Sequence, residues 1–297
     1  MNAAKKLLLA VLMTLATTTP SLAAETVLRA ARVEVHDPTQ LLAPDAKFWK
    51  SARLVEVAML PQMVAKPSNP NPAIKSLKVR AVHNGHWLAF LLEWDDPTQN
   101  DRVGIDRFGD QVAVQMPVKY DRKAIPNPMM GNPGGGRVDI WQWRAAFQRD
   151  LDAGEHHALG IYPHAMQQLR ELYPNAVVDL YPDEVLRATD ARPYMGALGV
   201  DNPISHPKRT PVLDQMAEGF GTLTAEPEQD ADGKGVWKDG KWRVVITHTM
   251  SSAEPEADIT VHPGGESIVA FAVWDGGSRE VGARKAWSAW VPLKLAK

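Results

Sequence analysis

The sequence predicts an all-β protein, built as an antiparallel β-sandwich with a short helix and a long loop-rich insertion. Three observations predict this class. Many short apolar runs are separated by Gly-rich turns, Asn-Gly and Asp-Gly pairs join neighbouring runs, and a clear helical period is confined to one segment. Short strands in this arrangement are typical of two sheets packed face to face.

Strands are expected along most of the chain, beginning with a weakly alternating run. Asn84-Gly85 and Asp239-Gly240 each lie between two apolar runs and predict hairpins, because both central residues of such a turn take positive φ. The strands assigned on these grounds are residues 26–35, 54–59, 77–82, 87–94, 111–118, the two arms of 236–250, and 267–274.

The expected helix occupies residues 163–172, where Met166, Leu169, Arg170 and Leu172 lie at helical spacing before the Tyr173-Pro174 stop. The region around 150–215 mixes Pro, Gly and Asp with short apolar pieces. This composition indicates an insertion within one domain rather than a separate domain.

Residues 1–23 have the features of a cleaved secretory signal. Lys5 and Lys6 precede an apolar run at 7–16, and Ser21 and Ala23 are small residues before the expected cut. The run is too short to span a membrane and has no twin arginine before it, so we expect general export and a single mature domain at 24–297. Any cofactor would then be inserted after export.

Composition excludes several classes of protein. Without the signal the chain has 31 basic and 35 acidic side chains, a net charge of −4, which disfavours nucleic acid as a partner. No second apolar run has membrane length. The absence of cysteine excludes disulfides, thiolate clusters and covalently attached c-type haem, so any haem must be held without covalent bonds.

The Met-Met-Gly loop, residues 126–136 with the sequence PNPMMGNPGGG, is the most informative segment. Its Pro and Gly content prevents a helix or strand, so Met129 and Met130 have no periodic face on which to be buried. They either fill a gap under the loop or offer a soft thioether to a metal such as haem iron. Met130 is the better ligand candidate, because the adjacent Gly131 allows a cofactor to approach closely.

Lys285 is the candidate for a second ligand. Counting by twos from Lys285 gives Trp287 and then a continuous apolar row, which places this lysine in phase with the buried face of its strand. It either sits in water at the end of the strand or gives up its proton and binds a metal as a neutral amine. A thioether and an amine on opposite sides of haem iron would leave no open position for substrate, which suits electron transfer.

Other residues offer weaker alternatives. Trp141 is an aromatic that could stack on a porphyrin, although core filling is the default for most of the ten tryptophans. His248 and His262 are alternative axial ligands, and a group at His156, His157 and His164 matches no established zinc spacing. No nucleophile elbow, Walker loop, dinucleotide fingerprint or zinc protease helix is present in the sequence, so catalysis by this chain alone is poorly supported.

Several segments together resemble a known family. They are DQVAVQMPV, PMMGNPGGGRVDIWQWRA, YPNAVVDLYP, AEGFGTLT, GVWKDGKWRVVI and AVWDGGSREVGARKAWSAW. In this order they are similar to the haem b (gamma) subunits of the periplasmic type II dimethyl sulfoxide reductase family, which includes ethylbenzene dehydrogenase, dimethyl sulfide dehydrogenase, chlorate reductase and selenate reductase. The resemblance covers most of the mature chain but is not close over 154–209.

The resemblance implies a β-sandwich like the cytochrome domains of some secreted dehydrogenases, with one haem b ligated by Met and Lys. These ligands fall on Met130, with Met129 as the near alternative, and on Lys285. It also implies a periplasmic heterotrimer with a molybdopterin catalytic subunit and an iron-sulfur subunit, passing electrons to or from a soluble c-type cytochrome. Two other functions stay open: a secreted carbohydrate-binding module, suggested by the tryptophans, and a metallohydrolase using the histidine group.

Overall fold

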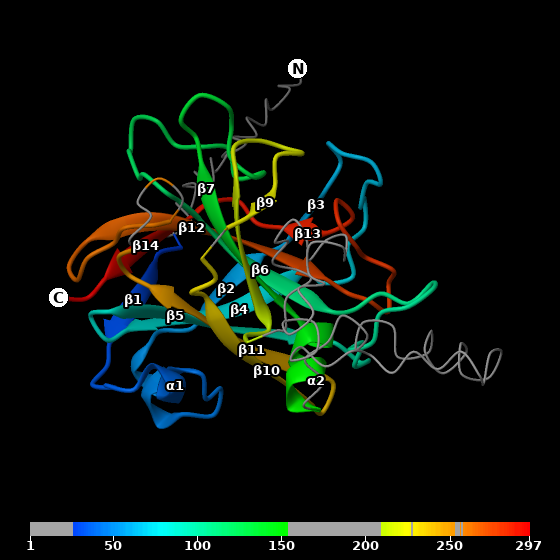
Figure 1. Cartoon of the computed structure of the whole chain (residues 1–297), viewed down its shortest axis with the longest axis horizontal. Helices are drawn as coiled ribbons and strands as arrows, with labels where there is room; N and C mark the ends of the chain where they lie inside the picture. The colour runs from blue at the N-terminus through cyan, green and yellow to red at the C-terminus, as the bar shows by residue number, and fades with distance from the viewer. Residues whose placement is uncertain (1–25, 154–208, 227, 253–255, 257) are drawn as a thin grey trace, which may run out of the picture.

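The computed structural model describes residues 26–153, 209–226, 228–252, 256 and 258–297, and it confirms an almost entirely β fold (Figure 1). The described helical elements are α1 (Pro38–Leu41), the 3₁₀ helix η1 (Lys47–Ser51) and α2 (Ala145–Asp152). The helix expected at 163–172 lies outside the described residues.

The first sheet has the strand order β10–β11–β5–β4–β1–β14. β2 pairs with the first half of β4, and β1 pairs with its last residues. Its strands are β10 (Asp232–Lys238), β11 (Lys241–Thr249), β5 (Trp87–Asp95), β4 (Ser76–His83), β1 (Leu28–Arg32), β14 (Val291–Leu295) and β2 (Val55–Ala58). The antiparallel expectation fails at one strand, because β1 runs parallel to both of its neighbours, β4 and β14.

The second sheet has the order β12–β6–β7–β8–β9, with the short strands β13 and β3 added beside β12. Its strands are β12 (Glu266–Trp274), β6 (Gln111–Pro117), β7 (Val138–Arg144), β8 (Val212–Ala217), β9 (Thr224–Ala225), β13 (Ala286–Trp287) and β3 (Leu60–Pro61). β12 joins the sheets, since its first half pairs with β14 and its second half with β6.

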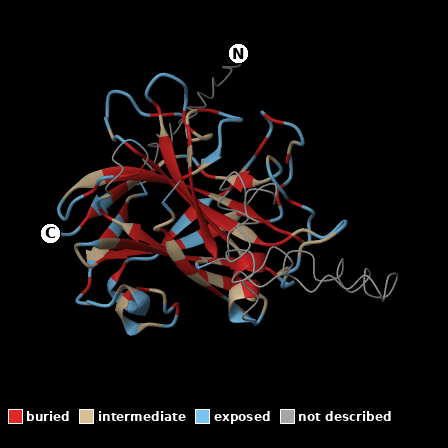
Figure 2. Ribbon diagram, viewed as in Figure 1, coloured by how far each residue is buried: buried red, intermediate tan, exposed pale blue. Residues whose placement is uncertain are grey.

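The main core lies between the two sheets, where the strands are almost continuously buried (Figure 2). Trp141 on β7 packs against Phe90 on β5, with ring centroids 6.2 Å apart, and Phe90 in turn meets the edge of Phe271 on β12 at 6.2 Å. Met116 is fully buried in this core, as its place in a strand predicts. Alternation along each strand therefore sends the other set of side chains to the outer face.

The two predicted hairpins differ in their turns. Asp239 and Gly240 both have positive φ, 52° and 72°, and close a two-residue turn between β10 and β11 as expected. At Asn84-Gly85 only the glycine has positive φ, so the expected two-residue turn is wrong there. A longer turn forms because the Asn84 side chain accepts hydrogen bonds from the backbone N–H groups of His86 and Trp87.

β8 and α2 are among the elements that form where the sequence suggested none. Residues 212–217 fall in the stretch assigned to the insertion, but they form β8, a strand paired along its whole length with β7. α2 follows β7 directly and is held at its start by a bond from Ala145 N–H to the Asp110 carbonyl. Neither has a strong local signal, because β8 is an apolar and polar mixture buried on both faces and α2 is only eight residues long.

Substitution of Gly235 by Ala tests the fit between the sheets. A Cβ on Gly235 in β10 would lie 2.1 Å from Cζ2 of the buried Trp143 ring, so we expect a loss of about 1–3 kcal/mol in the free energy of unfolding. Gly104→Ala is the control, since no atom lies within 4 Å of its added Cβ and its φ is not positive. Urea denaturation of both variants measures the difference, and equal stabilities would contradict this packing.

Candidate functional site

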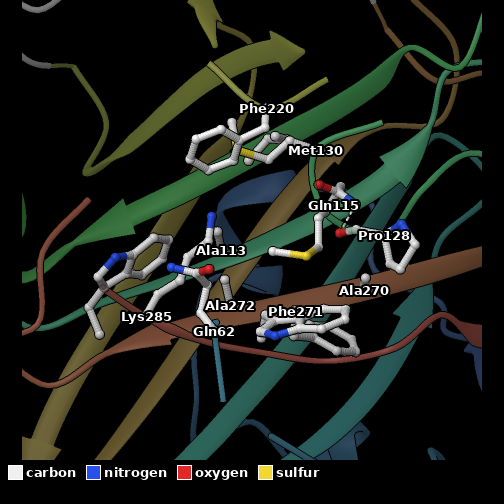
Figure 3. A pocket seen from close by; sticks show the side chains of 14 residues that line it. Gln62, Ala113, Gln115, Pro128, Met130, Phe220, Ala270, Phe271, Ala272 and Lys285 are labelled. Carbon is white, nitrogen blue, oxygen red and sulfur yellow. Dashed lines mark hydrogen bonds between the residues drawn. The ribbon is translucent and has the colours of Figure 1, made fainter. Parts of the chain in front are cut away.

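A pocket lies on the outer face of the second sheet, the face turned away from the main core (Figure 3). It encloses about 510 Å³ of empty space, counting the part open to solvent. Its lining residues are Gln62, Ala113, Gln115, Pro128, Met129, Met130, Ile140, Phe220, Ala270, Phe271, Ala272, Trp274, Lys285 and Trp287.

Strand alternation builds the floor of the pocket. Ala113 on β6 and Ile140 on β7 belong to the apolar outer-face cluster, and Ala272 on β12 packs against it. Ala272 is paired with Ala113, whereas Ile140 is paired with Gln115, the next residue of β6 on the same face. Because alanine adds only a methyl group to the sheet surface, this part of the face is low and smooth between larger residues at its edges. In Figure 3, Met130 and Phe220 are drawn at one side of the pocket and Lys285 at another, with Ala113 between them in this view.

The Met-Met-Gly loop forms one wall. Met130 has a φ of 68° and Gly131 a φ of 75°, so two successive residues take the left-handed conformation. Gly131 is required at its position, because a Cβ there would lie 2.2 Å from the carbonyl oxygen of Gly136. Met130 also packs against the outer-face cluster. The left-handed turn therefore brings this methionine back onto the sheet from a loop that has no periodic face of its own.

Three hydrogen bonds hold the methionine loop on the sheet. The Gln115 side chain donates to the Pro128 carbonyl at 3.0 Å, and the Met130 carbonyl accepts from the Gly219 N–H at 2.7 Å. The Trp290 indole donates to the Pro126 carbonyl at 2.7 Å, which ties the start of the loop to the C-terminal strands. The two methionines therefore occupy a loop fixed from three directions.

Lys285 is far from the methionine loop in the sequence but lines the same pocket. Its Nζ is 5.3 Å from the centre of the Trp274 ring, and no carboxylate among the described residues forms an ion pair with it. Removal of the ammonium from water lowers the pKa of Lys285 to about 8. The backbone before it is held by Gln62, whose buried amide donates to the Ala283 carbonyl at 2.8 Å. This lysine loses its proton more easily than an exposed one.

The continuous apolar row that the sequence predicts after Lys285 is wrong. The segment is two strands, β13 and β14, separated by an irregular stretch. Ala286 and Ser288 are buried while Ala289 is exposed, and burial then resumes at Val291. Even-numbered positions are buried before the break and odd-numbered positions after it. Alternation counted across the break therefore does not show which way Lys285 faces. Its place in the pocket comes instead from the pairing of β13 with β3 and β12.

The structure brings together three of the five predicted site residues, Met129, Met130 and Lys285. Gly131 shapes the methionine turn without lining the pocket. Trp141 is not brought to the pocket, because it points into the main core and its ring stacks on His248 at 4.5 Å. Its neighbour Ile140 occupies the pocket face instead, as alternation requires.

The alternative ligands lie elsewhere. His248 is fully buried between the sheets, and His262 is exposed; neither lines the pocket. His156, His157 and His164 lie outside the described residues. Sequence reasoning did not single out Gln62, Phe220 or Trp274 as pocket residues. Phe220 carries a usable signal, since it is an apolar residue between two glycines in a polar segment, and its side chain is 53% exposed.

The chain is similar to proteins of known name. The sequence model of a family described as ethylbenzene dehydrogenase matches residues 46–286. A proposed respiratory nitrate reductase heme subunit of Haloferax mediterranei is 25% identical over 248 residues, which is 83% of this chain and 66% of that protein. The chlorate reductase subunit gamma of Ideonella dechloratans is also 25% identical over 248 residues, 82% of this chain and 75% of that protein.

A solved structure is also similar in part. A family 9 carbohydrate binding module from Caldicellulosiruptor kristjanssonii, in complex with glucose, aligns over 91% of this chain and 96% of its own, with a TM-score of 0.42 and 10% identity.

The helices among the described residues are all too short or too polar to cross a membrane.

Substitution of Gly131 by Ala tests how the methionine wall is built. We expect Gly131→Ala to lower the free energy of unfolding by more than Gly134→Ala, because both positions have positive φ, 75° and 84°, but only Gly131 faces a backbone oxygen. The common cost of positive φ is about 1–2 kcal/mol. Thermal unfolding of the two variants measures the additional cost of the clash, and an equal loss would contradict the close approach to Gly136.

Proposed function

Because the chain belongs to the ethylbenzene dehydrogenase family, we propose that it is an electron-transfer subunit that binds one noncovalent haem b in the pocket on the outer face of β6, β7 and β12. The observation that carries the proposal is the presence of a methionine wall and a lysine with lowered pKa in one pocket. The names of the two relatives, a heme subunit and a chlorate reductase gamma subunit, support the same role.

The residues of the pocket fit a haem. Ala113, Ala270 and Ala272 form a low apolar floor that suits the face of a planar macrocycle, and Phe220 and Trp287 offer aromatic surfaces beside it. The chain has no cysteine, so the fit is to a noncovalent haem and not to a c-type one. This donor set, thioether and amine in an apolar pocket, is also poor for a hard cation, which prefers oxygen ligands.

Met130 and Lys285 are the proposed axial ligands, with Met129 as the alternative to Met130. A ligating amine must be neutral, and desolvation has already lowered the pKa of Lys285 to about 8. No carboxylate of the described residues holds the ammonium in place. A methionine thioether stabilises the reduced form of iron and raises its reduction potential. Two protein ligands would leave no open coordination position, so the group would supply one-electron transfer without binding substrate.

The rest of the chain would exclude water and keep the ligands in place. The buried Gln62 positions the segment before Lys285, and Gln115 positions the loop before the methionines. Both act through backbone carbonyls. Fixed ligand positions of this kind reduce the rearrangement that accompanies a change of oxidation state, which is the property that an electron-transfer site needs.

We further propose the setting of this subunit. The signal-like residues 1–23 would direct export, so the chain would work in the periplasm. It would form a heterotrimer with a molybdopterin catalytic subunit and an iron-sulfur subunit, and would relay electrons between the iron-sulfur subunit and a soluble c-type cytochrome. This arrangement is supported by the names of the relatives, one of which is the gamma subunit of a chlorate reductase.

Replacement of the ligands tests the assignment. We expect the chain reconstituted with haem to show low-spin Soret and α bands, and Met130→Ala and Lys285→Ala each to convert the spectrum to a high-spin or weakly bound form. Met129→Ala is the matched control, because it removes the adjacent thioether from the same loop. If Met129→Ala changes the bands and Met130→Ala does not, Met129 is the ligand. Unchanged bands in the double variant of Met130 and Lys285 would reject the proposal.

The pH dependence of haem binding gives a second test. The amine of Lys285 must be neutral to bind iron, so below its pKa of about 8 the proton competes with the metal. We expect the haem affinity of the haem-free chain to rise by up to about tenfold per pH unit between roughly pH 6 and pH 8, and then to level off. Lys285→Met keeps a long side chain without a proton to lose, and titration of this variant should show no such rise.

A further inference from the structure

A second group of potential ligands lies between the two sheets, on the opposite face of β7 from the pocket. It consists of Asp139 on β7, Asp214 on β8, His248 on β11 and Asp258 in the loop before β12. One ligand atom from each residue lies within 4.8 Å of all the others, and all four residues are 0–1% exposed. We call these residues the inter-sheet cluster.

The orientation of His248 directs a ring nitrogen into the inter-sheet cluster. Its Nδ1 lies 2.8 Å from the Thr249 carbonyl oxygen, and since a carbonyl can only accept, Nδ1 carries the proton. Nε2 then faces carboxylate oxygens of Asp214 at 3.2 Å, Asp230 at 3.0 Å and Asp258 at 3.6 Å. A histidine that binds a metal through one ring nitrogen usually donates the N–H of the other to a carbonyl, a carboxylate or water, as Nδ1 of His248 does to a carbonyl here.

The cluster holds more acidic side chains than the described basic side chains can pair with. Glu226 and Asp230 add two further carboxyl groups, and Glu226 is anchored there by its N–H, which donates to the Asp214 carbonyl at 3.1 Å. His248 is the only basic side chain in the described part of the chain that forms an ion pair with these acids. The burial of an ionised carboxylate without a compensating charge lowers the free energy of unfolding by roughly several kcal/mol, because the carboxylate loses its hydration.

Unpartnered oxygens point to a missing cation. Among the described residues, Oδ1 of Asp139 and Oδ1 of Asp214 are buried and have no hydrogen-bond partner. Apart from the contact of Asp214 with His248, the hydrogen bonds to these two groups are long: Ile259 N–H reaches Asp139 at 3.4 Å and Ala231 N–H reaches Asp214 at 3.2 Å. Buried oxygens are normally satisfied, so these atoms indicate a ligand that completes the cluster.

A second acidic group in the same protein shows the contrast. Asp96, Asp110 and Asp275 also lie close together and are buried. Asp110, however, accepts from the N–H of Asn100 at 2.7 Å, from Gly276 N–H at 2.8 Å and from the Trp242 indole at 2.9 Å. Both of its oxygens therefore have N–H donors, and that group contains no histidine. The second group has one buried oxygen without a hydrogen-bond partner, Oδ2 of Asp96, whereas the inter-sheet cluster has one on each of its three acids and also contains a histidine.

We propose that the inter-sheet cluster binds one divalent cation through Asp139, Asp214, Asp258 and Nε2 of His248. Three carboxylates and one imidazole form a mixed oxygen and nitrogen set, which suits Mn²⁺ or Zn²⁺ better than Mg²⁺ or Ca²⁺. Asp230 borders the site and is 36% exposed at its side chain, which provides an entry route from solvent. The cation would link β7 and β8 of one sheet to β11 of the other.

Metal analysis of the full chain tests this site. We expect about one equivalent of a divalent cation per chain in addition to any haem iron, removable by EDTA. Addition of Mn²⁺ or Zn²⁺ to the EDTA-treated chain should raise its Tm by several degrees, and Ca²⁺ and Mg²⁺ should raise it less. Electron paramagnetic resonance of added Mn²⁺ counts the bound ions directly.

Matched variants separate a metal site from a merely acidic core. Asp139→Asn keeps the side-chain shape and should weaken Mn²⁺ binding at least about tenfold, whereas Asp110→Asn should leave it unchanged. If Asp139→Asn does not fold, the chelator and Mn²⁺ response of the unmodified chain decides the matter. Absence of bound metal together with no Tm response to any of the four cations would overturn the proposal. It would mean that the carboxyl groups of the cluster are kept neutral by bound protons instead. Equal Mn²⁺ binding by the two variants would also overturn it.

Discussion

The two-sided use of β7 is the constraint on which the rest of the structure depends. Consecutive residues of this strand face two different buried environments, with Asp139 and Trp141 toward the inter-sheet core and Ile140 toward the pocket. The pocket cannot shift by one residue without exchanging these sets, because the period of a strand is two. The same alternation continues into β6, which pairs with β7, and into β12, which pairs with β6, and it places their small residues on the pocket floor.

The two faces support different chemistry. The outer face is apolar, with a methionine loop and a lysine whose pKa is lowered to about 8, which fits a large group of low charge density. The inner face contains carboxylates and an imidazole arranged around unpartnered oxygens, which fits a small cation. Trp141 belongs to the inner face, since its ring lies in the main core and stacks on His248.

The chain belongs to the ethylbenzene dehydrogenase family, and two of its relatives are named as subunits of larger enzymes. Its proposed role needs rigidity more than reactivity. Hydrogen bonds to backbone carbonyls from Gln62, Gln115 and Trp290 hold both walls of the pocket, and none of these side chains needs to change its protonation state. The segments they tie together come from distant parts of the sequence, so the pocket exists only in the folded chain.

The sequence by itself determined the β class, most of the strands, the Asp239-Gly240 turn and the candidates Met129 and Met130, because these depend on local composition and spacing. It singled out Lys285 on an apolar row that the structure interrupts, so the place of this lysine in the pocket was decided by strand pairing. It did not determine β8, the parity change between Ala286 and Val291, or the inward direction of Trp141, because each depends on which strand lies alongside. The inter-sheet cluster likewise joins residues from 139 to 258. Only packing of one sheet on the other brings those acids and His248 within reach of a single ion.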